Sequence, residues 1–250
     1  MSNEGGLIVG WHAVLAALRA PSSSVKEVWV RRGREDRRSE ELLQIARERD
    51  VPVRTVDAAA LDERAEGVSH QGVMAYVTGG RQLDEAALDQ LLDGLGRPPF
   101  LLVLDGVQDP HNLGACLRTA DAAGVDAVIA PRDRAVGLTP AVRKTAAGAA
   151  ETLPFVQVTN LARCLRGLQE RGIWVIGTAD EAEQTLYQAD LKGPLALVLG
   201  AEEKGMRRLT RENCDLLVRI PMQGTVESLN VSVATAVCLY EALRQRGPHP

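Results

Sequence analysis

Short apolar runs recur along the chain at regular intervals, and each run is typical of a buried strand. In the C-terminal part the predicted strands are, in chain order, residues 100–105, 126–130, 155–158, 173–178, 195–200 and 216–220. Helix-like segments of about 10–15 residues separate most of them, which is the spacing of βαβ crossovers. The pattern therefore predicts a mainly parallel sheet with helices on both faces.

The N-terminal part has a different and more compact pattern. Its predicted elements are a helix at 11–19, a strand at 25–30, a helix at 39–49, and strands at 53–56 and 72–77. Residues 79–98 open on glycines, close on prolines and carry apolar residues at helical spacing, which predicts a linker with a short helix. We therefore expect an α/β protein with a small domain at residues 1–78 and a larger one at residues 99–250.

The composition is that of an ordinary globular protein, with 45% apolar and 25% charged residues. Aromatic residues make up only 3%, which argues against a stacking platform for single-stranded bases as the main binding device. The net charge of −4 argues against non-specific coating of nucleic acid but allows local basic surfaces. No apolar run is long enough to span a bilayer, and the first residues lack the pattern of a secretory signal, so we expect a cytoplasmic protein without membrane contact.

The four cysteines, Cys116, Cys164, Cys214 and Cys238, lie far apart in the sequence, and three of them fall in helix-like segments. This distribution is typical of reduced, buried thiols and favours neither a disulfide framework nor a zinc site. We therefore expect no bound metal.

A basic run follows the predicted strand at 25–30. It contains five arginines within eight residues: Arg31, Arg32, Arg34, Arg37 and Arg38. One interpretation is a solvated loop, which is what most charge runs form. The other is an RNA-binding patch, because the planar guanidinium group suits phosphate contacts.

The common nucleotide-binding motifs do not fit the larger domain. No G-x-G-x-x-G follows its first predicted strand, which excludes the dinucleotide-binding fingerprint. Gly200 and Gly205 have the spacing of a phosphate-binding loop, but Met206 stands where that motif needs lysine. Chemistry on the phosphates of a nucleoside triphosphate is therefore not expected.

Three motifs follow predicted strands and carry polar residues suited to a site. The first, DPHNLG at 109–114, leads into a predicted helix that carries Arg118; Asn112 could cap that helix with Arg118 in solvent, or both could face one pocket. The second, GAEEKGM at 200–206, has glycines that allow close backbone approach to a ligand, or forms an ordinary turn. The third, IPM at 220–222 and SLNVS at 228–232, ends a strand and begins a predicted helix that Ser228 could cap.

Together these motifs resemble the three signature motifs of the SpoU/TrmH family of RNA ribose 2′-O-methyltransferases. The resemblance implies S-adenosyl-L-methionine as the cofactor, a homodimer, and a C-terminal domain threaded into a trefoil knot. Methyl transfer to a ribose hydroxyl requires two aligned reactants and removal of a proton. By this resemblance the catalytic residues are Asn112, Arg118, Glu202, Ser228 and Asn230. The implied cofactor contacts are Gly200, Ile220 and Leu229, with Gly177, Thr178, Gly205 and Met222 at the same pocket.

The N-terminal domain narrows the expected substrate. GWHAVLAAL at 10–18 and VSHQGVMA at 68–75 resemble the L30e-like RNA-binding domain of family members that methylate a guanosine of 23S rRNA. Alternatives are a relative that acts on tRNA or another rRNA site, including one that confers antibiotic resistance, or a non-catalytic RNA-binding relative. One departure from the family is Glu227, where relatives often carry a small residue.

Overall fold

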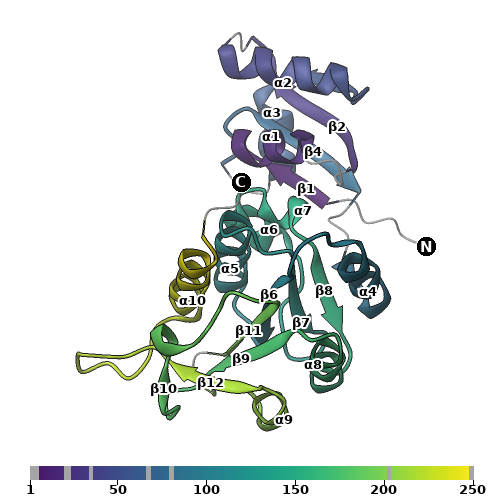
Figure 1. The fold of residues 1–250 in the computed structure, drawn as a ribbon. Helices are drawn as coiled ribbons and strands as arrows, with labels where there is room; N and C mark the ends of the chain where they lie inside the picture. The colour runs from purple at the N-terminus through teal and green to yellow at the C-terminus, as the bar shows by residue number, and fades with distance from the viewer. Residues whose placement is uncertain are drawn as a thin grey trace. The chain divides into compact units, whose positions relative to one another are not determined.

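The computed structural model describes residues 6–19, 24–33, 36–65, 69–78, 82–201 and 204–247. Two of the predicted site residues, Arg34 and Glu202, lie outside these ranges. The chain forms two compact units (Figure 1). Unit 1 is formed within Met1–Arg81 and by Leu138–Thr152, and unit 2 by Gln82–Gly137 and Leu153–Pro250.

Unit 1 is a four-stranded sheet with helices on both faces. Its first elements are β1 (Gly6–Val9), α1 (Trp11–Arg19), β2 (Ser24–Arg31), α2 (Arg37–Glu48), β3 (Val53–Val56), α3 (Ala58–Ala65) and β4 (Val73–Thr78). The strand order is β1-β4-β2-β3, with only β2 and β3 parallel. Residues of α1 and α2 fill the core on one face, and Leu61 and Ala65 of α3 pack on the other.

A segment distant in sequence completes unit 1. The helices α6 (Pro140–Ala146) and α7 (Ala149–Thr152) belong to it, and α7 packs against α1 while α6 packs against β1. Gly148 connects the two helices with φ +101°, and a Cβ there would lie 2.9 Å from that of Ala16 in α1. The close approach of these backbones therefore requires glycine.

Unit 2 contains an eight-stranded sheet of order β10-β12-β9-β11-β6-β7-β8-β5 in which every paired strand is parallel. Its strands are β5 (Gln82–Leu83), β6 (Phe100–Asp105), β7 (Ala127–Pro131), β8 (Phe155–Val158), β9 (Trp174–Thr178), β10 (Gln184–Thr185), β11 (Leu195–Gly200) and β12 (Leu216–Arg219). Its helices are α4 (Glu85–Gly94), α5 (Pro110–Ala122), α8 (Leu161–Glu170), the 3-10 turn η1 (Leu186–Gln188), α9 (Arg208–Glu212) and α10 (Val231–Arg246). The predicted parallel α/β sheet is confirmed, whereas the knot stays a prediction.

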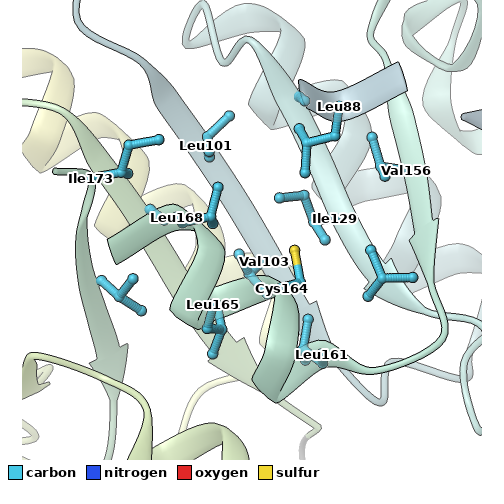
Figure 2. Close-up of a cluster of buried hydrophobic side chains, with 14 of the residues drawn as sticks. Leu88, Leu101, Val103, Ile129, Val156, Leu161, Cys164, Leu165, Leu168 and Ile173 are labelled. Carbon is cyan, nitrogen blue, oxygen red and sulfur yellow. The ribbon is translucent and has the colours of Figure 1, made fainter. Parts of the chain in front are cut away.

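Helices α4 and α8 cover one face of this sheet, and α5 and α10 lie on the other (Figure 1). Figure 2 shows α8 across the strands, with Leu161, Leu165 and Leu168 packed among buried strand residues. Leu88 and Leu92 of α4 join the same core. From Gln82 onward, the segment predicted as a linker belongs to unit 2, and it contains the expected helix, whose apolar face is buried there.

The cysteines behave as buried thiols. All four are free, and Cys116, Cys164 and Cys238 are buried. Burial raises the pKa of the Cys238 thiol to about 12, so this side chain stays protonated. Within the described ranges, no cluster of three potential metal ligands occurs and no helix is long and apolar enough to cross a membrane.

Candidate active site

The three motifs meet at one edge of the unit 2 sheet. Strands β6, β9, β11 and β12 run parallel, so their carboxyl ends lie at the same edge. Ligands of open parallel sheets bind outside this edge. The loops after β6, β11 and β12 carry the first, second and third motifs, which brings distant segments of the chain together.

The first motif begins α5, but Asp109 rather than Asn112 caps the helix. Asp109 is the capping residue, and its Oδ1 accepts hydrogen bonds from the amides of His111 at 2.7 Å and Asn112 at 2.9 Å. Pro110 occupies the first turn, where its missing N–H costs nothing. Because Asp109 supplies the cap, the Asn112 side chain is directed to other contacts.

The third motif provides a hydrogen-bond partner for the Asn112 side chain. Asn230, rather than Ser228, caps α10, and its Oδ1 accepts from the amide of Ser232 at 3.0 Å. The Asn230 Nδ2 donates to the Asn112 Oδ1 at 3.1 Å. Helix α10 therefore begins at Val231, two residues later than a cap at Ser228 would give, and the bond between the two asparagines joins the starts of α5 and α10.

The second motif folds back on itself. The Ala201 amide donates to the Gly205 carbonyl at 3.2 Å, and the Gly205 amide donates to the Ala201 carbonyl at 2.8 Å. A Cβ on Gly200 would lie 2.0 Å from the Gly205 carbonyl carbon and 2.1 Å from the Met206 nitrogen. Gly205 has φ +59°, in the region that favours glycine. Both glycines are therefore required by the loop itself.

An ion pair between a buried carboxylate and a half-exposed arginine anchors the far end of this loop. The Asp105 side chain, at the end of β6, is 0% exposed. Its Oδ2 accepts from the Arg207 amide at 2.8 Å, and its Oδ1 accepts from the Arg207 Nε at 2.6 Å. The sequence pattern did not single out either residue. The pair ties the first motif's strand to the residue that follows Met206.

A cavity of about 420 Å³ opens among the second and third motifs and the end of β9. The predicted site residues that line it are Thr178, Gly200, Gly205, Ile220, Met222, Ser228 and Leu229. Glu227 also lines this first cavity. Hence the one residue that departs from the family pattern stands beside the pocket expected to bind cofactor.

Gly177 does not line the first cavity; it lies against Met206, which does. A Cβ at this position would lie 2.7 Å from both the Cys214 Sγ and the Met206 Cε. Met206 is itself a lining residue. Burial, with smaller contributions from the charges of Asp215 and Asp105, raises the pKa of the Cys214 thiol to about 12. Gly177 therefore leaves room for a neutral, apolar floor.

A second cavity of about 300 Å³ lies beside the first motif. Gly106, Gln108, Asp109 and Asn112 line it, and it shares Ala201, Lys204 and Val231 with the first cavity. Lys204 is thus the one cation that lines both cavities among the described residues. Lys204 lies within the second motif, but the sequence pattern gave it no role.

Arg118 does not join this cluster. It is exposed on α5 and lines neither cavity. Six residues along an α-helix place Arg118 about 120° around the axis from Asn112. The structure therefore joins Asn112 to Asn230 and places Ser228 in the wall of the first cavity, but it leaves Arg118 on another face.

The basic run of unit 1 is divided among several elements. Arg31 ends β2, Arg32 lies in the following turn 3.6 Å from Asp57, and Arg37 and Arg38 begin α2. All four side chains are exposed. Exposure suits both interpretations of the run, so RNA contact stays a prediction.

Comparisons with known proteins agree with the motifs. The family model described as "SpoU rRNA Methylase family" matches residues 99–240, and that described as "RNA 2′-O ribose methyltransferase substrate binding" matches residues 7–83. The chain is 59% identical over 239 residues to the 23S rRNA (guanosine-2′-O-)-methyltransferase RlmB of Pseudomonas putida, covering 96% of each protein.

Solved structures place the fold in the same group. The SpoU methyltransferase AviRb of Streptomyces viridochromogenes, in complex with AdoMet, is 25% identical with a TM-score of 0.79, covering 97% of this chain and 90% of AviRb. A TrmH/SpoU tRNA modifying enzyme of A. aeolicus is 31% identical with a TM-score of 0.55, covering 65% of this chain and 83% of that one. The chain belongs to the SpoU rRNA methylase family.

Proposed function

We propose that the protein transfers a methyl group from S-adenosyl-L-methionine to the ribose 2′-hydroxyl of a guanosine in 23S rRNA. The observation that carries this proposal is the Asn112–Asn230 hydrogen bond beside two adjoining cavities, built from all three family motifs. A methyl transferase needs two such adjoining spaces, one for the donor and one for the acceptor. The 59% identical relative is named for this reaction.

The first cavity fits the cofactor. Its volume of about 420 Å³ lies within the range of ligand pockets, and apolar Leu199, Ile220 and Leu229 offer surfaces for an adenine ring. The carboxylates of Asp180 and Glu181 line the same cavity and can accept hydrogen bonds from ribose hydroxyls. When bound, S-adenosyl-L-methionine supplies an electrophilic methyl group on a cationic sulfonium.

The second cavity fits the acceptor ribose. Asn112 lines this cavity and carries an amide group that can donate to and accept from a ribose hydroxyl, and its hydrogen bond with Asn230 fixes its orientation. Lys204, at the boundary between the cavities, provides a positive charge for the neighbouring phosphate. These residues hold the hydroxyl oxygen in line with the methyl group.

We assign Arg118 a role in activating the ribose hydroxyl that receives the methyl group. A guanidinium group does not accept a proton at ordinary pH, so Arg118 acts by stabilising negative charge on the oxygen as its proton leaves. Because Arg118 lines neither cavity, a second copy of the chain brings this residue to the site. We therefore propose a homodimer with shared sites.

The apolar surface of α10 provides an interface for this dimer. Val233 and Tyr240 lie seven residues apart on one face of the helix and are 48% and 51% exposed. Ala236 and Val237 lie between them and are only partly buried. A second copy would cover this continuous apolar stripe.

Replacing Tyr240 with glutamate is expected to convert the dimer into a monomer, because a charge would be buried at the interface. Sedimentation velocity would show the change in mass, and methyl transfer would fall while S-adenosyl-L-methionine still binds. Leu209→Glu is the matched control, since Leu209 is 53% exposed on α9. A Tyr240→Glu protein that remains dimeric would show that α10 is not the interface.

Asp105→Asn is expected to weaken cofactor binding by roughly tenfold, the loss of one charge-assisted hydrogen bond. The amide would turn an N–H group toward a donor of Arg207 and release the end of the 201–206 loop. Isothermal titration with S-adenosyl-L-methionine measures the effect. Arg208→Gln removes an exposed pair with Glu212 and should bind normally, so equal affinities of the two variants would contradict an anchoring role.

The substrate is tested by mapping 2′-O-methyl groups in 23S rRNA and tRNA from cells that lack the gene. One guanosine of 23S rRNA should lose its methyl group and regain it when the wild-type gene, but not an Arg118→Ala gene, is restored. The match of residues 7–83 to a substrate-binding family favours rRNA, since the A. aeolicus tRNA enzyme covers only 65% of this chain. Loss of a tRNA methyl group instead would establish the alternative. With an rRNA substrate, we propose a cytoplasmic location for the enzyme.

A further inference from the structure

The unit 1 sheet has a second face whose chemistry differs from that of its core. In β2, Val28 and Val30 pack with α1 and α2, whereas Trp29 belongs to the cluster on the opposite face. Side chains alternate along a strand, so Arg31 lies on the same face as Trp29. Arg31 is paired in register with Val56, which also belongs to the Trp29 cluster.

Two further arginines are held over the Trp29 ring. The guanidinium carbons of Arg54, on β3, and Arg64, on α3, lie 5.2 Å and 5.3 Å from the ring centroid. Arg64 also donates to the Tyr76 hydroxyl at 2.9 Å, and the Tyr76 ring meets the Trp29 ring edge-on at 5.3 Å. Stacking fixes the plane of each guanidinium group.

These arginines keep their charge available. Arg31, Arg54 and Arg64 are exposed, and none of them forms an ion pair with an acid in the described part of the chain. The carboxylate of Glu27 on this face accepts the indole N–H of Trp29 at 2.7 Å. Trp29 itself is only 7% exposed, which leaves no open ring for a base to stack on.

We propose that Arg54 and Arg64, which Trp29 and Tyr76 hold in place, form together with Arg31 a phosphate-binding face of unit 1 that contacts the sugar–phosphate backbone of folded rRNA. Planar guanidinium groups with fixed orientation bind phosphate oxygens in pairs and lose little rotamer freedom on binding. This inference rests on the proposed rRNA substrate. It also separates Arg31 from Arg37 and Arg38, because α2 packs on the opposite face of the sheet.

The test is the salt dependence of binding to a 23S rRNA fragment that the wild-type protein methylates. In the double variant Arg54→Gln/Arg64→Gln, the slope of log K against log salt should be shallower by about 0.7–0.9 for each lost phosphate contact. Affinity should fall by roughly tenfold or more at moderate salt. The binding of S-adenosyl-L-methionine should not change.

Matched variants distinguish the loss of positive charge from a change in the structure of this face. Arg54→Lys/Arg64→Lys should recover the salt slope, because it restores both charges, whereas Arg37→Gln/Arg38→Gln should retain the wild-type slope. A glutamine variant that folds normally and keeps the wild-type slope would overturn the inference. If the wild-type protein methylates no 23S rRNA fragment, the proposed function itself fails and the salt test is not reached.

Discussion

Arg118→Ala is expected to reduce the single-turnover rate of methyl transfer by roughly 100- to 1,000-fold, the usual effect of removing a group that stabilises developing negative charge. Cofactor affinity should be unchanged, because Arg118 does not line the first cavity. Rapid-quench measurement with labelled S-adenosyl-L-methionine gives the rate. Arg166→Ala, an exposed arginine on α8, is the matched control and should react normally. A near-normal rate for Arg118→Ala would show that Arg118 does not stabilise charge on the reacting oxygen.

Mixing Arg118→Ala with Gly200→Val, at a cofactor concentration that fills the wild-type cavity but not the Gly200→Val cavity, tests whether the site is shared between subunits. In a dimer of Arg118→Ala with Gly200→Val, the intact cofactor cavity of one subunit would receive Arg118 from the other. Random exchange should restore about a quarter of the wild-type activity, because half of the dimers are mixed and each has one complete site. If no activity returns although mixed dimers form, Arg118 serves its own subunit.

Gly200→Val is expected to weaken S-adenosyl-L-methionine binding by roughly tenfold to a hundredfold, the cost of overpacking a rigid site. The new side chain would collide with the backbone of Gly205 and Met206, which no side-chain rotation relieves. Titration calorimetry measures the affinity, and a thermal melt shows that the variant is folded.

A valine elsewhere provides the comparison for this result. Gly193 is exposed, and a Cβ there would meet nothing within 4 Å. Gly193→Val should therefore bind the cofactor like the wild-type protein. Unchanged binding by a folded Gly200→Val protein would mean that the cofactor lies outside the first cavity.

The central strands were predictable because they are buried on both faces and form continuous apolar runs. The sequence pattern predicts β6, β8 and β11 with the bounds that the structure has, and α1 likewise. It does not reveal β1 or α3. The four residues of β1 gain their register from β4, and α3 buries only Leu61 and Ala65, which is too weak a periodic signal.

The sequence was enough to predict which strand ends form the site. It was not enough to predict which way the side chains of the site point. Gly200 and Ile220 follow apolar runs, so their position at the sheet edge follows from the parallel topology. Asn112 and Arg118 share one helix, yet their separation in the sequence places them on different faces. The role of Asp105 depends on Arg207, 102 residues away, and an acid at a strand end carries no local sign of such a partner.

Unit 1 is built from two segments that are distant in the sequence, and this affects its folding during translation. When the segment up to β4 has left the ribosome, α6 and α7 have not yet been synthesised, so the surface of α1 around Ala13 and Ala16 has no cover. At ordinary rates of translation that interval is on the order of ten seconds. The nascent N-terminal segment therefore lacks this part of its packing while β6, α5 and β7 emerge.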